Sequence, residues 1–171
     1  MMATAMAVIE ASCGAVANTS PFVAADDHET VLARLSRLLE PYVAANHLGY
    51  LYHPRAVFRR QGSETEPDLM ARQPRAGGSV HERTRDAWDD APTPSLIVEV
   101  LSPSTRRRDH EYKRAFYMES GVPEYWVVDP DRREVLVVRQ NEADVVTTTE
   151  LIWQPSGVAE PLLLRVEQFF E

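Results

Sequence analysis

The sequence contains few cysteines and lysines and lacks several common functional motifs. Its single cysteine, Cys13, excludes an internal disulfide and a cysteine-based zinc cluster. No apolar run approaches the roughly 20 residues needed to span a bilayer, and residues 1–8 lack the charged front end of a signal peptide. There is also no glycine-rich phosphate loop and no Gly-x-Ser-x-Gly elbow of a serine hydrolase. These absences favour a cytoplasmic protein that is neither a serine hydrolase nor a nucleotide-binding protein with a glycine-rich phosphate loop.

Chain length and net charge indicate the number of domains and limit the possible kinds of binding partner. A chain of 171 residues can bury one hydrophobic core without disulfides, so we expect a single domain over residues 1–171. The formal net charge of −8 argues against a protein that coats nucleic acid without specificity. It leaves room for a local basic patch.

An apolar segment with an acid at its centre is the most informative part of the chain. Residues 95–101 follow a proline and are rich in branched side chains, which predicts a strand buried on both faces. Glu99 lies in the middle of this segment. An ionised carboxylate in a buried strand costs several kcal/mol unless a cation or a metal compensates its charge. Glu99 is therefore expected to have such a partner.

A helix is predicted directly after this strand. Ser104 or Thr105 can cap a helix over residues 106–120, and Gly121 is suited to the position just past its end. The predicted apolar stripe of this helix comprises Tyr112, Ala115 and Phe116.

This helix contains Lys113, the only lysine of the chain. A compact ammonium and a planar guanidinium are not interchangeable, so a single lysine among many arginines indicates chemistry that needs a point charge. The alternative is a surface ion pair with Asp109, four residues earlier. Such a pair contributes only a few tenths of a kcal/mol.

Periodicity and turn residues predict the remaining elements. Leucines at three- and four-residue spacing predict a helix that begins after Asp26 or Asp27, and Pro41 either ends it near residue 40 or kinks it so that it continues to residue 46. The predicted strands are residues 50–58, 67–71, 124–129, 134–139 and 145–153, and residues 162–170 form a closing helix or tail. The predicted connections are a hairpin at residues 6–18, a polar turn at 59–66 and a long surface loop at 72–93.

A longer string of residues carries a family resemblance. It comprises Pro67-Asp68, residues 97–105, Arg108-Asp109 with Lys113, and residues 121–130. This string closely resembles the Uma2 family of restriction-endonuclease-like proteins, a branch of the PD-(D/E)XK nuclease superfamily. The resemblance is strong over residues 67–130. It is looser upstream, at Glu10, Gly14, Ser20-Pro21 and His28.

The resemblance implies an α/β (α+β) fold, a restriction-endonuclease-like mixed β-sheet flanked by helices, with an N-terminal hairpin and a C-terminal hairpin. It also implies metal-binding acids on neighbouring strands, with Asp68 as the Asp of the PD motif and Glu99 as the acid of (D/E)XK. The motif lysine would fall at position 101, where this chain has Leu101. In the family a lysine from the following helix takes this place, and Lys113 is the candidate. We therefore predict that Asp68, Glu99 and Lys113 share one pocket.

Such a site has a definable chemistry. Two carboxylates and the backbone carbonyl of Val100 offer hard oxygen ligands that suit Mg²⁺ or Mn²⁺. The metal would polarise a phosphate and lower the pKa of a bound water, and Lys113 would hold that water or the developing charge. Glu10 is a further candidate ligand, with a solvated strand end as the alternative.

Other polar residues allow two interpretations each. Asp109 either orients Lys113 or forms a simple helix ion pair with it. His28 is interpreted as a capping or packing residue rather than a ligand. The basic residues around the helix start either contact a phosphate backbone or form a solvated basic turn; they are Arg106, Arg107, Arg108, His110 and Arg114.

Two functions follow. The first is a Mg²⁺- or Mn²⁺-dependent DNA endonuclease that hydrolyses phosphodiester bonds with metal-activated water. The second is a catalytically weak or inactive nuclease-fold protein that serves binding or assembly, which Leu101 and the acidic net charge favour. The apolar hairpin at residues 125–138 and the aromatic end Phe169-Phe170 further predict a symmetric homodimer.

Overall fold

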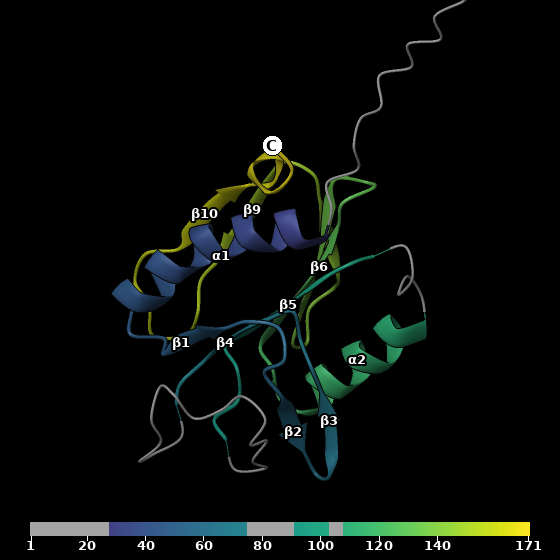
Figure 1. Cartoon of the computed structure of the whole chain (residues 1–171). Helices are drawn as coiled ribbons and strands as arrows, with labels where there is room; N and C mark the ends of the chain where they lie inside the picture. The colour runs from purple at the N-terminus through teal and green to yellow at the C-terminus, as the bar shows by residue number, and fades with distance from the viewer. Residues whose placement is uncertain (1–27, 75–90, 103–107) are drawn as a thin grey trace, which may run out of the picture.

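The computed structural model describes residues 28–74, 91–102 and 108–171, and in residues 108–110 it describes the backbone alone. A central sheet separates the two helices of this part of the chain, α1 (His28–Ala45) and α2 (Arg108–Glu119), as Figure 1 shows. None of the described helices is long and apolar enough to cross a membrane. The predicted hairpin at residues 6–18 and most of the loop predicted at 72–93 lie outside the described residues.

The central sheet has six strands in the order β1-β4-β5-β6-β7-β8. β5 and β6 are parallel, and the other neighbouring strands are antiparallel, so the predicted mixed sheet is confirmed. α2 forms the crossover between the two parallel strands, a connection that a short turn could not make. The strands are β1 (Tyr50–Tyr52), β4 (Leu69–Arg72), β5 (Leu96–Val100), β6 (Glu124–Asp129), β7 (Glu134–Arg139) and β8 (Val145–Thr147).

Two small antiparallel sheets flank the central one. The hairpin of β2 (Phe58–Arg60) and β3 (Ser63–Thr65) lies on the α2 side, where Phe58 packs against Phe116 and Tyr117 of the helix. On the α1 side are β9 (Glu150–Trp153), β10 (Leu162–Arg165) and the 3₁₀ helix η1 (Val166–Phe169), as seen in Figure 1.

The alternation of side chains along the buried strands creates two hydrophobic cores. On β6, Trp126 and Val128 face the core under α1, whereas Tyr125 and Val127 face the core under α2. All residues of β5 are also buried. This confirms the prediction of a strand with two buried faces around Glu99.

α1 continues through Pro41 and ends at Ala45, one residue before the end predicted for a helix that continues past the proline. Leu35 and Leu39 are fully buried, and Tyr42 packs partly buried against the same core. Proline removes one helical hydrogen bond. The packing of this apolar face against the sheet holds the last turn of the helix in place.

The buried face of α2 differs from the predicted stripe. Phe116 is buried as expected, but Tyr112 and Ala115 are exposed. Tyr117, which was not included in the stripe, is fully buried. The helix ends where predicted because Gly121 adopts a φ of +80°, which glycine accommodates without strain.

The prediction of one strand over residues 50–58 was wrong. Pro54 and Arg55 form a turn that separates β1 from β2. The polar turn predicted at residues 59–66 contains most of the β2–β3 hairpin instead. The proline in the middle of the segment marks the break between the two strands.

The C-terminal segments also divide differently from the prediction. Residues 145–153 form β8 and β9, which belong to two different sheets, and residues 162–170 begin as β10 before η1. A bend at residues 148–149 interrupts the apolar pattern. By contrast, the strands predicted at residues 124–129 and 134–139 have the bounds of β6 and β7.

The apolar surface that predicted a homodimer is buried within the chain itself. Tyr125, Val138, Phe169 and Phe170 are at most 4% exposed. Each packs into one of the two cores of its own chain. This basis for the dimer was therefore wrong.

Replacing Gly49 with alanine is expected to destabilise the fold by about 2 kcal/mol. Gly49 has a φ of +99°, and a Cβ at this position would overlap the backbone carbonyl of Arg72. Gly62 is a suitable control, because its φ is +79° but the space around an added Cβ is open. Chemical denaturation of Gly49→Ala and Gly62→Ala separates the cost of the Cβ overlap from the cost of a positive φ, because only Gly49 has both. Equal losses in the two variants would contradict the overlap with Arg72.

Candidate active site

Asp68 lies at the entrance to β4, beside the end of β5. These strands are antiparallel, with Leu69 opposite Val98, so the residue before β4 meets the last residues of β5. The backbone amide of Val100 donates a hydrogen bond to Asp68 Oδ2 at 2.8 Å. This hydrogen bond holds the carboxylate at the edge of the sheet where β5 ends.

His28 contacts the same carboxylate from α1. Its Nε2 lies 3.1 Å from Asp68 Oδ2, and its side chain is partly buried. The sequence indicated only capping or packing for this histidine, so its contact with Asp68 was missed. No local pattern predicts a contact between residues that are 40 positions apart.

Glu99 is buried in β5, and both oxygens of its carboxylate accept hydrogen bonds. Lys113 Nζ donates to Oε2 at 3.1 Å, and the Tyr117 hydroxyl donates to Oε1 at 2.8 Å. Burial raises the pKa of Glu99 from its ordinary value of 4.5 to about 7; the charge of Lys113 opposes this rise, and the charge of Asp68 adds to it. The protein thus compensates the buried charge of Glu99 only in part.

Lys113 and Tyr117 reach Glu99 from the same face of α2. They are four residues apart, a spacing that places side chains one above the other on a helix. Burial, and after it the charge of Glu99, raises the pKa of the Tyr117 hydroxyl well above its ordinary value. Tyr117 was not predicted as a site residue. Its spacing from Lys113 is the signal that could have identified it.

The arrangement suits a positively charged ligand. Asp68 lies close enough to Glu99 for its charge to raise the pKa of Glu99, and Lys113 is the cation beside Glu99. In the described parts of the chain, no group of three or more His, Cys, Asp and Glu side chains is arranged to hold a metal ion. A metal at this site would therefore need other oxygen ligands as well, such as the Val100 carbonyl and water.

Some predicted site residues cannot be placed in this arrangement. Glu10, Arg106 and Arg107 lie outside the described residues. Arg108 and Asp109 belong to α2, but their side chains are not described. Their predicted roles stay predictions.

Arg114 is engaged in an ion pair away from the two acids. Its Nη2 donates to both carboxylate oxygens of Asp144, at 2.8 and 3.0 Å. Asp144 lies between β7 and β8. This partner offsets the charge that Arg114 was predicted to offer to a nucleic acid.

Leu101 follows β5 at the position where the superfamily motif has lysine. Its side chain is partly buried against the core under α2. The ammonium beside Glu99 comes from α2 instead, through Lys113.

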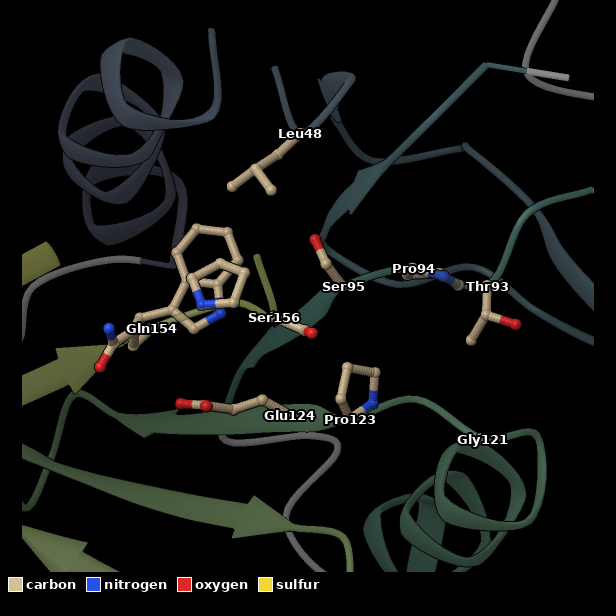
Figure 2. Close-up of a pocket in the computed structure, with 11 residues that line it drawn as sticks. Leu48, Thr93, Pro94, Ser95, Gly121, Pro123, Glu124, Gln154 and Ser156 are labelled. Atoms are coloured by element: carbon tan, nitrogen blue, oxygen red, sulfur yellow. The ribbon is translucent and has the colours of Figure 1, made fainter. Parts of the chain in front are cut away.

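A separate pocket opens at the opposite ends of β5 and β6, as shown in Figure 2. It has a volume of about 350 Å³, and Ser95 and Glu124 at the starts of the two strands line it. The Glu124 carboxylate accepts hydrogen bonds from Arg139 and from the Trp126 indole. This pocket is separate from the candidate catalytic centre, because neither Asp68 nor Glu99 lines it.

The structure is similar to the crystal structure of a putative nuclease belonging to DUF820 from Anabaena variabilis, with a TM-score of 0.64 and 15% sequence identity. The similarity covers 84% of this chain and 79% of that one, and at this identity it supports the fold alone. The search of curated proteins gave no match. The model of the Uma2 family, described as "Putative restriction endonuclease", matches residues 13–170, and the chain therefore belongs to the Uma2 family.

Proposed function

We propose that this protein is a DNA-cleaving phosphodiester hydrolase that requires Mg²⁺ or Mn²⁺. The observation that carries the proposal is the juxtaposition of Asp68 and Glu99 at one edge of the sheet, with Lys113 bound to Glu99. Membership in a family described as restriction endonucleases supports the same class of reaction.

The donor atoms at the site fit a hard divalent cation. Asp68 and Glu99 would supply carboxylate oxygens, and the backbone carbonyl of Val100 is a further candidate ligand. The raised pKa of Glu99 supports this fit, because it reflects a negative charge that the protein compensates only in part. A bound divalent cation would supply Lewis-acid polarisation of a phosphate and activation of water.

The residues around the two acids have distinct tasks in this proposal. The Val100 amide and His28 hold the Asp68 carboxylate in one orientation. Tyr117 does the same for Glu99 from the buried side. Lys113 would stabilise the negative charge that develops on the phosphate during cleavage.

The second candidate function is a nuclease-fold protein with little or no catalytic turnover. Leu101 in place of the motif lysine favours it, as does the ion pair that already occupies Lys113. Such a binding or assembly protein would have no need for a tight metal site. Metal affinity therefore separates the two candidates.

We expect one Mn²⁺ to bind per chain in a calorimetric titration. Asp68→Asn and Glu99→Gln should each weaken binding at least about 10-fold, because each removes a charged ligand. Glu124→Gln is the matched control: Glu124 is also a buried acid of the central sheet, but it is paired with Arg139 at the opposite edge. The same samples are then incubated with single-stranded and duplex DNA in Mn²⁺.

The hydrolase would be supported if the wild-type protein bound Mn²⁺ and cleaved DNA, and if Asp68→Asn and Glu99→Gln both lost cleavage. If the wild-type protein bound no Mn²⁺ at millimolar concentration and cleaved neither substrate, the proposal would be rejected in favour of the binding protein.

A further inference from the structure

Arg55 occupies a backbone conformation that arginine rarely adopts. Its φ is +81°, in the left-handed region that favours glycine. Ala56 N donates to His53 O at 3.2 Å, so Pro54 and Arg55 are the two central residues of a tight turn. Proline followed by a residue of positive φ is typical of a type II turn, whose second central position is normally glycine. Strained positions of this kind are concentrated at functional sites.

The register of the sheet places this turn at the edge where the two acids lie. β1 is antiparallel to β4, with Tyr52 opposite Met70. The chain that leaves β1 therefore passes the entrance of β4, where Asp68 is located. In Figure 1 the same segment continues from β1 past β4 toward the β2–β3 hairpin. The backbone of Arg55 therefore lies at the same end of the sheet as Asp68.

Arg55 also differs from most arginines of the described structure in having no partner. Arg59, Arg114, Arg132, Arg139 and Arg165 form ion pairs with acids. Within the described residues, Arg55 is exposed and has no ion pair, hydrogen bond or aromatic contact. In a chain with a net charge of −8, its guanidinium is available to an external anion at this edge.

We propose that Arg55 binds a backbone phosphate of the nucleic acid that lies across Asp68 and Glu99. A guanidinium presents several N–H donors in a plane and pairs with phosphate oxygens in a bidentate manner. Contacts of this kind position a duplex or single strand without reading its sequence. This inference rests on the proposed function, and it assigns the substrate contact to a residue outside the family motif.

The test measures DNA binding in the presence of Ca²⁺, so that binding is read separately from Mg²⁺- or Mn²⁺-dependent cleavage. Arg55→Ala should weaken binding of a fluorescent oligonucleotide about 10-fold near 0.1 M salt and lower the slope of log K against log salt by about one. Arg55→Lys should retain that slope. Arg37→Ala is the matched control, because Arg37 is likewise exposed and without a partner in the described structure but lies in the middle of α1.

A thermal melt adds a readout that does not depend on DNA. Arg55→Gly should melt a few degrees higher than the wild type, because glycine adopts this φ without strain, and yet bind DNA as weakly as Arg55→Ala. Wild-type affinity in Arg55→Ala and in Arg55→Gly would overturn the inference and leave the proposed hydrolase intact. If the wild-type protein bound neither single-stranded nor duplex DNA, the inference and the proposed function would both be rejected.

Discussion

Glu99→Gln is expected to stabilise the metal-free protein at pH 8 while it abolishes DNA cleavage. In the folded protein, burial raises the pKa of Glu99 from 4.5 to about 7 despite the ion pair with Lys113. At about 1.4 kcal/mol for each pKa unit, the ionised side chain then costs the fold roughly 3 kcal/mol. Glutamine keeps the shape and removes the charge, so the variant should gain up to roughly that amount.

The pH dependence of this gain follows from the direction of the shift. A carboxyl group with a raised pKa in the folded state binds its proton more tightly when the protein is folded. The stabilisation of the folded state that results from this tighter proton binding is fully present below pH 4.5, and it is lost as the pH rises to about 7. The stability difference between Glu99→Gln and the wild type should therefore be small at pH 4.5 and should reach its full value above pH 7.

Urea denaturation in EDTA at a series of pH values measures this difference. Glu124→Gln is the control with the opposite sign, because it breaks the hydrogen bonds of a buried acid with Arg139 and should destabilise the protein at pH 8. Added Mn²⁺ should raise the melting temperature of the wild type at pH 8 more than that of Glu99→Gln. A loss of stability in metal-free Glu99→Gln at pH 8 would contradict an uncompensated charge on Glu99.

Lys113→Arg is expected to fold normally and to lose on the order of 100-fold in cleavage rate. Arginine keeps a positive charge near Glu99, so the variant should still fold, with a loss in the free energy of unfolding of about 1 kcal/mol. The larger planar guanidinium cannot occupy the position of the Lys113 ammonium, which lies 3.1 Å from Glu99 Oε2 in a partly buried space. It should therefore misplace the charge that acts on the phosphate.

The matched control is Arg114→Lys, which exchanges arginine for lysine at the next position of α2. Arg114→Lys keeps a cation beside Asp144, and we expect cleavage close to the wild-type rate. Single-turnover cleavage in Mn²⁺ and thermal melts of both variants provide the comparison. Full activity in Lys113→Arg would remove Lys113 from the chemistry and leave it only as the counter-ion of Glu99.

Much of the fold could be predicted from the sequence because its signals are local. The branched run around Glu99 predicted β5, and the turn between residues 129 and 134 predicted the hairpin of β6 and β7. The glycine at position 121 marked the end of α2. Predictions failed where a turn divides an apolar segment, as at Pro54 and Arg55, because composition does not reveal to which sheet each half of a segment belongs.

The sequence by itself determined the candidate acids and the lysine. Asp68 follows from the family motif, and Glu99 follows from that motif and from the cost of a charge in a buried strand. Lys113 follows from being the only lysine of the chain and from the family resemblance. Only the tertiary structure decided which groups surround them. His28 reaches Asp68 across 40 residues, and Tyr117 reaches Glu99 across 18. These contacts depend on the order of the strands and on the face of the sheet that each helix covers. Long-range pairings produce that order, and the local periodicity of a single sequence does not encode it.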